Sequence, residues 1–303
     1  MSSAFTMVRE ALLMPFAGNR ARFASGVFQN GVCLPASLQE RAVAAKPLPP
    51  ARSLAGNYIF GGYFFHHYGH FLLESLSRLY AVRQCKKLPL LFMSQHTDIP
   101  APQREVLDLT GLDNEIIFIS EPTLVESLIV SPPGAGTEPP WMLEEQMRSL
   151  GRFKAPPLLA GQKVWLSRSR FLRHHGGGGV VNEHLIDEKL LELGWLVVYP
   201  EQLPSVRDQI RLISSAEIVA GFDGSAFFNA LLADRLRGRF IIFGRRQRIA
   251  PAVMRLLTQK GAAVTAHVPY VLDVLGNDSD YLYHLPDINE VLNVLRRAQM
   301  ENV

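Results

Sequence analysis

The second half of the chain alternates short apolar runs with helical stretches, and this alternation limits the possible folds more than any other feature. The runs KVWL, WLVVY, EIVA, FIIF and AVTAHV occupy residues 163–166, 195–199, 217–220, 240–243 and 263–268. Helices are predicted between successive runs, with Asn182 and Ser205 as N-caps. Strands that alternate with helices build a parallel sheet with helices on both faces. The sequence therefore predicts an α/β fold.

The first half predicts a further α/β domain. A strand or loop is expected at 57–65, strands are expected at 88–93, 115–119 and 124–130, and a helix is expected at 102–109, where a proline opens it. Strand, helix and strand joined by short turns are typical of α/β proteins.

Proline and glycine set the expected domain boundary. Residues 1–55 show few periodic runs and are expected to form short strands and loops that cover a sheet edge. Residues 131–157 concentrate turn residues, so the inter-domain connection is expected there. We predict an N-terminal α/β domain over residues 1–155 and a C-terminal α/β domain over residues 156–303. The amphipathic last helix of the chain is expected to be able to pack back on the first domain.

Composition excludes several classes of protein. The chain has 303 residues, of which 48% are apolar and 19% are charged, so it is globular. Its net charge of +3 is too small to argue for nucleic-acid binding but suits anionic ligands or a peripheral contact with an anionic membrane. Cys33 and Cys85 form no CxxC pattern, which argues against a disulfide scaffold and a structural zinc site. Because Arg9 and Glu10 interrupt the first apolar run, no signal peptide is predicted and a cytoplasmic location is expected.

Residues 61–83, GGYFFHHYGHFLLESLSRLYAVR, carry the densest chemical signal. Leucines at helical spacing predict that an aromatic run leads into a helix. On a regular helix, His70, Glu74 and Arg78 fall on one stripe, one turn apart. A helix N-terminus also favours an anionic ligand. We therefore expect this stripe to form one wall of a cleft.

Two other interpretations of this stripe stay open. The first is a solvated helix face with an i,i+4 ion pair, which is common on helices. The second is a metal site, because His66, His70 and Glu74 are spaced four residues apart and could hold zinc.

Three turns in the second half follow predicted strands directly, where doubly wound sheets bind ligands. The turn at 167–170 reads SRSR and has Arg173 shortly after it, and arginine forks with serine hydroxyls suit a diphosphate. The pair Asn182 and Glu183 is good helix-capping chemistry, or else a carboxylate for ribose or sugar hydroxyls. The turn GFDGSA at 221–226 would let a ligand approach the backbone and the following helix.

These motifs, in this order, resemble family 61 glycosyltransferases over roughly residues 57–235. The segment HFLLESLSRL resembles the first conserved block of that family, and KVWLSRS, VVNE and the stretch WLVVYPEQLPSVRDQI resemble the later blocks. The family's donor-side positions map onto Ser167, Arg168, Arg173, Asn182, Glu183, Gly221, Asp223, Gly224, Ser225 and Ala226.

One position departs from the family pattern. The family's glycine turn usually carries a histidine where this chain has Asp223. Because an aspartate repels phosphate, we expect Asp223 to face sugar or ribose hydroxyls.

The resemblance implies two Rossmann-like domains in a GT-B type architecture, and an inverting glycosyltransferase. A nucleotide-sugar donor is expected on the C-terminal domain and a glycan or other hydroxyl acceptor on the N-terminal one, across a gap between them. His70 or Glu74 is expected to act as base, with Arg78 orienting Glu74. Arg168 and Arg173 are expected to neutralise the diphosphate, so no metal and no further cofactor are expected. The expected setting is bacterial surface polysaccharide synthesis, such as a capsule, on the cytoplasmic side of the membrane.

Three alternative functions are considered beside this one. A catalytically inactive nucleotide-sugar-binding or scaffold protein would explain Asp223. A metal-dependent hydrolase would use His66, His70 and Glu74. A nucleic-acid binder is not favoured, because no aromatic platform accompanies its basic residues. Those residues are Arg235, Arg237, Arg239, Arg245, Arg246 and Arg248.

Overall fold

The computed structural model describes residues 5–19, 22–85, 87–170, 179–245, 249–274 and 282–300. The chain divides into two compact units, Met1–Arg152 and Phe153–Val303, close to the predicted boundary after residue 155. Each unit has its own buried apolar cluster. Among the described helices, none is both long and apolar enough to span a lipid bilayer.

Unit 2 is built on a five-stranded sheet in which every pair of neighbouring strands is parallel. In spatial order the strands are β13 (Leu196–Val198), β11 (Leu159–Leu166), β14 (Ala216–Phe222), β15 (Arg239–Phe243) and β16 (Ala263–His267). Numbered along the chain within this sheet, the order is 2-1-3-4-5, one of the two common doubly wound orders. The predicted parallel sheet, and with it the α/β class, is confirmed.

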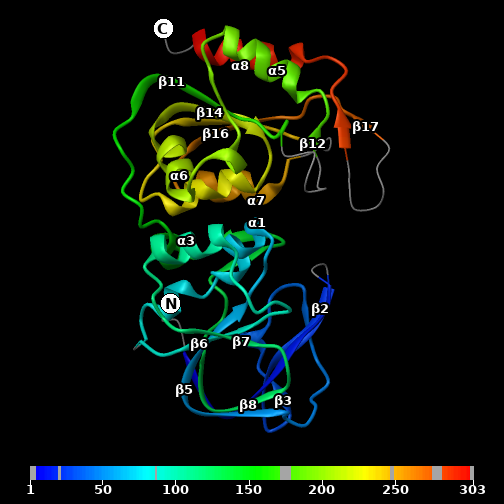
Figure 1. The fold of residues 1–303 in the computed structure, drawn as a ribbon, viewed down its shortest axis with the longest axis vertical. Helices are drawn as coiled ribbons and strands as arrows, with labels where there is room; N and C mark the ends of the chain where they lie inside the picture. The colour runs from blue at the N-terminus through cyan, green and yellow to red at the C-terminus, as the bar shows by residue number, and fades with distance from the viewer. Residues whose placement is uncertain are drawn as a thin grey trace. The chain divides into compact units, whose positions relative to one another are not determined.

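Helices cover both faces of this sheet, so that the unit has three layers (Figure 1). One face carries α5 (Glu183–Glu192) and α8 (Asn289–Met300), and the other carries α6 (Val206–Ser215) and α7 (Pro251–Gln259). The side chains of Val291, Leu292 and Leu295 bury α8 in the core of unit 2. From the sequence, this helix could also have packed on the first domain. In the structure, its apolar side chains lie in the buried cluster of unit 2.

Local chemistry sets where the elements of unit 2 begin and end. Ser205 caps α6, because its Oγ accepts a hydrogen bond from the Asp208 amide at 3.0 Å. Gly194, with φ of 74°, follows α5 in the left-handed conformation that glycine favours. The predicted helix after β14 is a 3₁₀ helix, η5 (Ser225–Leu232). The remaining elements are η4 (Pro200–Gln202) and a small sheet of β12 (Gly179–Val180), β17 (Leu272–Val274) and β18 (Leu282–His284).

Unit 1 contains an eight-stranded mixed sheet rather than a wholly parallel one. The path along it runs through β3 (Val32–Cys33), β2 (Arg22–Gln29), β1 (Thr6–Asn19), β8 (Thr123–Val130), β5 (Arg52–Tyr63), β6 (Leu90–Met93) and β7 (Ile116–Ile119), and β4 (Ala42–Ala44) pairs with β2. From β8 to β7 the strands are parallel, whereas β1 is antiparallel to both of its neighbours. The other elements are η1 (Pro35–Ser37), α3 (Ala101–Thr110), β9 (Ala135–Thr137), β10 (Pro140–Met142) and α4 (Glu144–Leu150).

The expectation that residues 1–55 are mostly irregular is wrong, because β1 and β2 are long strands. Their alternation is interrupted. Glu10 has φ of 50°, and the buried side chains change from even to odd positions between Val8 and Ala11. The register with β2 shifts again between Met14 and Ala17, around Pro15. A strand whose side chains change face does not show the simple period of two.

The predicted helix after β5 is broken into three pieces. It consists of α1 (Tyr68–His70), a π-helical turn η2 (Phe71–Ser75) and α2 (Leu79–Val82). The Leu76 amide bonds to the Phe71 carbonyl five residues back, at 3.1 Å, which is the mark of a π turn. Because this turn is wider than an α-helical turn, the predicted stripe does not continue regularly from Glu74 to Arg78.

Candidate active site

The strand order of unit 2 reverses beside β11, because β13 lies on one side of it and all later strands lie on the other. In doubly wound sheets, ligands bind beyond the carboxyl ends of the strands at this point. The turn 167–170 follows β11 there, and the turn 223–225 follows β14. A Cβ built on Gly224 would lie 2.7 Å from Arg168 Nη1. Glycine at 224 therefore makes room for the Arg168 guanidinium against the second turn.

Positive charge is concentrated at these turns. Burial and, to a smaller extent, repulsion from Arg245 lower the pKa of Arg168 to about 10, against the attraction of nearby carboxylates. Arg168 stays protonated at neutral pH because this value is well above 7. Arg245 follows β15, which lies on the other side of β14 from β11. Two guanidiniums at the ends of the strands on either side of β14 suit a ligand with two negative charges, such as a diphosphate.

Asp223 uses both carboxylate oxygens inside the protein. Its Oδ1 accepts from Arg245 Nε at 2.8 Å, and its Oδ2 accepts from the Ala250 amide at 3.0 Å. The expectation that Asp223 faces sugar or ribose hydroxyls therefore finds no support in its contacts. The observed role of this carboxylate is to hold Arg245 and the backbone that begins α7.

The predicted serine ligands also have internal partners. Ser167 Oγ lies 2.8 Å and Ser169 Oγ 2.7 Å from Asp187 Oδ2, and Trp165 Nε1 donates to Oδ1 at 3.0 Å. Burial raises the pKa of Asp187, while these hydrogen bonds lower it. Asp187 thus fixes the turn after β11, and the serines shape the turn that presents Arg168.

Glu183 fixes the same turn from the start of α5. Its Oε1 accepts from the Arg168 amide at 3.0 Å, and its side chain is fully buried. Burial raises the pKa of Glu183 to about 8, with a smaller contribution from Asp187. Within the described residues, Glu183 Oε2 has no hydrogen-bond partner.

Asn182 stands at the N-cap position of α5, but its side chain does not cap the helix. Its Nδ2 donates to the Leu285 carbonyl at 2.8 Å, and its Oδ1 accepts from the Leu285 amide at 3.1 Å. The predicted cap is wrong, because this amide pairs with a distant backbone segment as a peptide group would.

The other predicted donor-side residues are placed as follows. Gly221 lies within β14, where a Cβ would come 2.8 Å from the Leu166 carbonyl, so its role is the close pairing of two strands. Ser225 and Ala226 begin η5 and are half-buried. Arg173 lies outside the described residues.

In unit 1, His70, Glu74 and Arg41 form one hydrogen-bonded cluster. Glu74 is almost completely buried, and both His70 Nδ1 and Arg41 Nη2 contact its Oε1. Arg41 Nη2 also lies 3.0 Å from His70 Nδ1. The side chains of His70 and Arg41 keep 22% and 18% of their surface exposed, so the cluster is reachable from solvent.

This cluster has the arrangement of an oriented base. A carboxylate only accepts hydrogen bonds, so we assign the His70 proton to Nδ1, where it bonds to Glu74. The lone pair of His70 is then on Nε2, which can accept a proton. Arg41 offsets the charge of Glu74. A carboxylate that fixes the tautomer of an imidazole is a recurring device for general-base catalysis.

Arg78 does not contact Glu74 in the described structure, contrary to its predicted orienting role. Its Nη2 donates to the carbonyls of Ala36 and Ser37 at 3.0 and 3.2 Å, and its Nε donates to the Ser131 carbonyl at 3.0 Å. Burial lowers its pKa to about 10. Arg78 therefore holds the loop that leads to Arg41, and it can act on the cluster only through that loop.

The family model named Glycosyltransferase 61 matches residues 68–237, which is more than half of the chain. The chain belongs to glycosyltransferase family 61. It is therefore a transferase with a sugar donor and an acceptor. No curated protein matches the chain.

The family 61 match covers His70, Glu74 and the turns at Arg168 and Gly224. Arg41 and Arg245 lie outside it. Sequence reasoning missed the contact of Arg41 with Glu74, because an isolated arginine in a loop shows no periodicity. It noticed Arg245 only as part of a basic group. Asp187 was missed because its position on a helix face does not reveal its serine and tryptophan partners.

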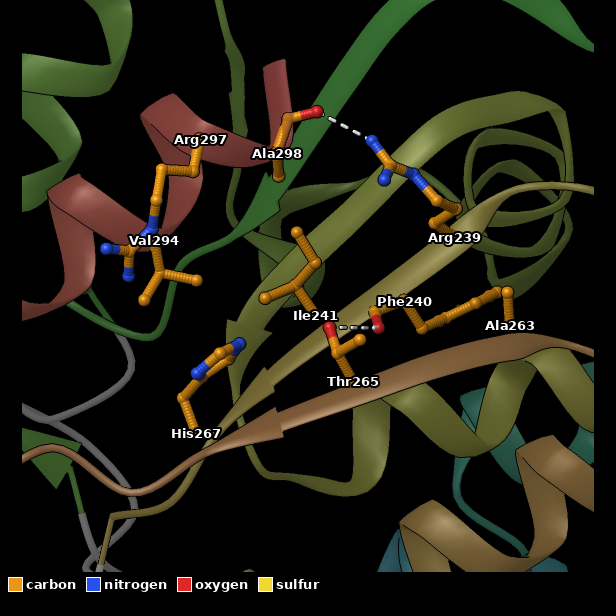
Figure 2. A pocket seen from close by; sticks show the side chains of 9 residues that line it. All are labelled: Arg239, Phe240, Ile241, Ala263, Thr265, His267, Val294, Arg297 and Ala298. Carbon is orange, nitrogen blue, oxygen red and sulfur yellow. Dashed lines mark hydrogen bonds between the residues drawn. The ribbon is translucent and has the colours of Figure 1, made fainter. Parts of the chain in front are cut away.

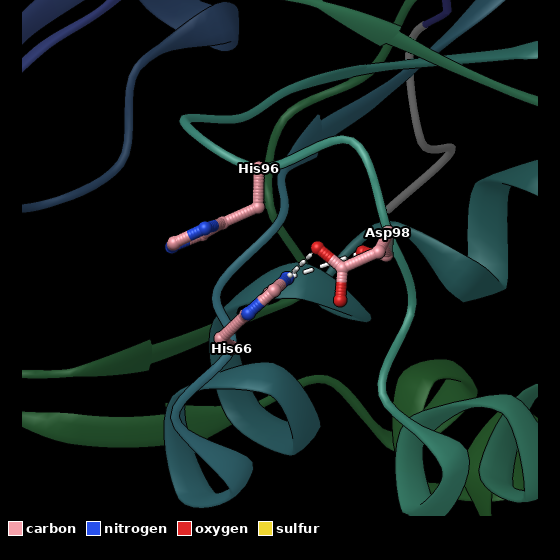
Figure 3. Close-up of side chains that lie close together, drawn as sticks. All are labelled: His66, His96 and Asp98. Carbon is pink, nitrogen blue, oxygen red and sulfur yellow. Dashed lines mark hydrogen bonds and ion pairs between the residues drawn. The ribbon is translucent and has the colours of Figure 1, made fainter.

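The predicted metal set of His66, His70 and Glu74 does not assemble in this family 61 chain. In the described residues, the ligand atoms that gather within 4.8 Å of one another belong to His66, His96 and Asp98 (Figure 3). The His66 and His96 rings are stacked with centroids 3.8 Å apart, and His66 Nε2 lies 3.6 Å from Asp98 Oδ1. Because ring nitrogens bind metals in the ring plane, stacked rings do not direct their lone pairs at one point. We assign this cluster no metal.

Proposed function

We propose that this family 61 glycosyltransferase is inverting and moves a sugar from a nucleotide-sugar to a hydroxyl acceptor without using a metal. The observation that carries this proposal is the placement of Arg168 after β11 and of Arg245 after β15, the two strands that flank β14, beside the small turn at Gly224. A nucleotide-sugar donor carries a diphosphate, whose charge these two guanidiniums match.

On the donor side, the two arginines stabilise the leaving group. As the bond between the sugar anomeric carbon and the diphosphate oxygen breaks, the electron pair stays on that oxygen and negative charge grows there. Glu183 holds the backbone of the turn that carries Arg168, and Asp223 holds the Arg245 guanidinium, so the two charges are kept in place before the reaction begins. Preoriented positive charge of this kind does the work that a divalent cation does in other transferases.

On the acceptor side, His70 is the proposed base. The acceptor oxygen attacks the anomeric carbon from the face opposite the leaving group, and its proton passes to His70 Nε2. One bond to the anomeric carbon forms as the other breaks, so the configuration inverts. Glu74 and Arg41 keep His70 in the tautomer that this step needs.

The first experiment separates donor binding from catalysis. Binding of UDP- and GDP-sugars is measured by calorimetry, and turnover is measured as transfer or donor hydrolysis. His70→Ala and Glu74→Gln should lower turnover at least 100-fold and change the donor Kd less than twofold. Arg168→Gln should raise the donor Kd at least tenfold.

Two variants serve as controls. Arg170→Gln removes a nearby charge, but Arg170 is exposed and stacks on Tyr199, and His96→Ala removes an exposed imidazole of unit 1. Both should behave as wild type. Wild-type turnover in His70→Ala and Glu74→Gln would refute the assigned base. Donor binding by the wild-type chain with no turnover would instead support a nucleotide-sugar-binding scaffold.

The wider setting forms part of the same proposal. We infer a GT-B type protein of bacterial surface polysaccharide assembly that works on the cytoplasmic side of a membrane, with peripheral contact. The family membership and the doubly wound sheet of unit 2 support this proposal. Loss of surface polysaccharide in a deletion strain, restored by the wild-type chain but not by Glu74→Gln, is the expected result.

A further inference from the structure

Unit 2 has a cavity of about 200 Å³ away from the turns that hold Arg168 (Figure 2). It lies between α8 and the strands β15 and β16, and nothing in the proposed transfer reaction uses it. Its lining residues are Arg239, Phe240, Ile241, Ala263, Thr265, His267, Val294, Arg297 and Ala298.

The cavity follows from the alternation of the edge strand. Ala263, Thr265 and His267 are two residues apart on β16, so their side chains point to the face that α8 covers. The buried stripe of α8 packs on the interior strands, and Val294 and Arg297 stand at its margin. Because residues 263 and 298 are alanines, the space between this margin and the edge strand is not filled.

The cavity has an apolar middle and basic ends. Ile241 lies at its centre, between Arg239 at one end and the pair His267 and Arg297 at the other (Figure 2). Arg239 donates to the Ala298 carbonyl at 2.6 Å and so ties the end of α8 to β15. None of the lining residues is an aspartate or glutamate.

The guanidinium of Arg297 is the charged group that can bind a ligand here. Among the described residues, no carboxylate forms an ion pair with it. The cavity also holds His267, whose pKa is lowered by burial and by the charge of Arg297. A neutral imidazole beside a guanidinium offers one charged fork and one hydrogen-bonding nitrogen, which together suit a small oxyanion.

We propose that this cavity binds a small organic anion, with a carboxylate or phosphate head at Arg297 and His267 and a short apolar body against Ile241 and Val294. Its volume equals roughly seven water molecules of liquid, which limits the ligand to about ten non-hydrogen atoms. A nucleotide-sugar is several times larger, so this site is distinct from the proposed donor site.

Calorimetry on the full chain, with hexanoate as probe, tests the proposal. Wild type should bind hexanoate with one site and a Kd of roughly 1 mM, as expected for so small a ligand. Pentyl phosphate is the second probe and should bind as tightly or more tightly if the site favours phosphate. Hexan-1-ol, which lacks the charge, and inorganic phosphate, which lacks the apolar body, should bind at least tenfold more weakly.

Two variants locate the site and one is a matched control. Arg297→Gln removes the charge, and Thr265→Phe fills the cavity from an exposed position of the edge strand. Each should weaken hexanoate binding at least tenfold. Arg296→Gln removes the neighbouring charge on α8, whose Nη1 instead contacts Asn293 at 3.2 Å, and should leave binding unchanged.

The following results would overturn the proposal. One is the absence of saturable binding of either probe to wild type. Another is binding of hexan-1-ol as tight as that of hexanoate. The third is undiminished hexanoate binding by both Arg297→Gln and Thr265→Phe. Circular dichroism and thermal melting without ligand show whether each variant is folded, so weakened binding by a folded variant counts in favour. Because no donor is present in this experiment, its result is independent of the proposed transfer reaction.

Discussion

At the scale of single residues, the site of unit 2 depends on carboxylates that contact other protein groups. Asp223 at a strand end and Asp187 on α5 have the residue type of ligand-binding groups, yet their oxygens hold Arg245 and the serines of the turn. The turn that carries Arg168 and the Arg245 guanidinium are thereby held when no ligand is present. The polar residues of the turns hold the site in place, and the two half-buried guanidiniums supply its positive charge.

Glu183 gives a prediction about pH and stability. Its folded pKa of about 8 lies above the unfolded value, so its stabilising contribution is complete below pH 4.5 and is lost as the pH rises through 8. Asp187, whose pKa is also raised, acts in the same direction. The unfolding free energy of wild type should therefore fall between pH 5.5 and 8.5. In Glu183→Gln it should fall by roughly 2 kcal/mol less over the same range.

Urea denaturation at several pH values, followed by fluorescence, measures this change. Glu188→Gln is the control, because Glu188 is on the same helix but exposed. It should keep the wild-type dependence on pH. The same dependence in Glu183→Gln would mean that Glu183 is already ionised in the folded chain.

At the scale of elements, Arg78 connects the broken helix of unit 1 to the loop that leads to Arg41. Arg78→Met should leave the carbonyls of Ala36, Ser37 and Ser131 without their donor. We expect this change to cost about 3 kcal/mol of stability, since each unsatisfied buried carbonyl costs about 1–3 kcal/mol. Turnover should fall while the donor Kd stays constant, because Arg41 loses its fixed position beside Glu74.

Thermal melting and the split between kcat and donor Kd check this prediction. Arg148→Met is the control, because Arg148 is exposed and forms ion pairs with Glu144 and Glu145 on its own helix. Arg78→Lys should recover part of the stability, since lysine keeps the charge but not the fork of donors. Unchanged stability in Arg78→Met would show that the loop is held by other contacts.

The elements that could be predicted from the sequence are those with an uninterrupted period. The apolar runs of β11, β14 and β15 and the capped helix α6 are of this kind. The elements predicted wrongly contain an irregularity that depends on tertiary packing, as in β1 with its change of face and in the π turn at Phe71–Ser75. The contact between His70 and Glu74 could be expected from local spacing. The contacts of Arg41 and Arg245 could not be predicted, because their partners are distant in sequence.

At the scale of the whole molecule, the two units are built on different sheets. The wholly parallel sheet of unit 2 was predicted, because each of its strands is a separate apolar run. The mixed sheet of unit 1 was not, since the order β1–β8–β5 joins strands that are far apart in sequence. Their buried clusters share no residue, and each cluster lies entirely within one unit.

Separate cores predict separate responses to mutation. Arg78→Met should speed amide hydrogen exchange in the strands of unit 1 on the order of 10²-fold, which corresponds to about 3 kcal/mol of lost stability. Exchange in β14 and β15 should change less than twofold, because no residue of their core is altered. Mass spectrometry of peptides from the two units reads both effects in one experiment. An equal acceleration in both units would instead show that they unfold as one cooperative body, and the variants of one unit would then perturb the chemistry of the other.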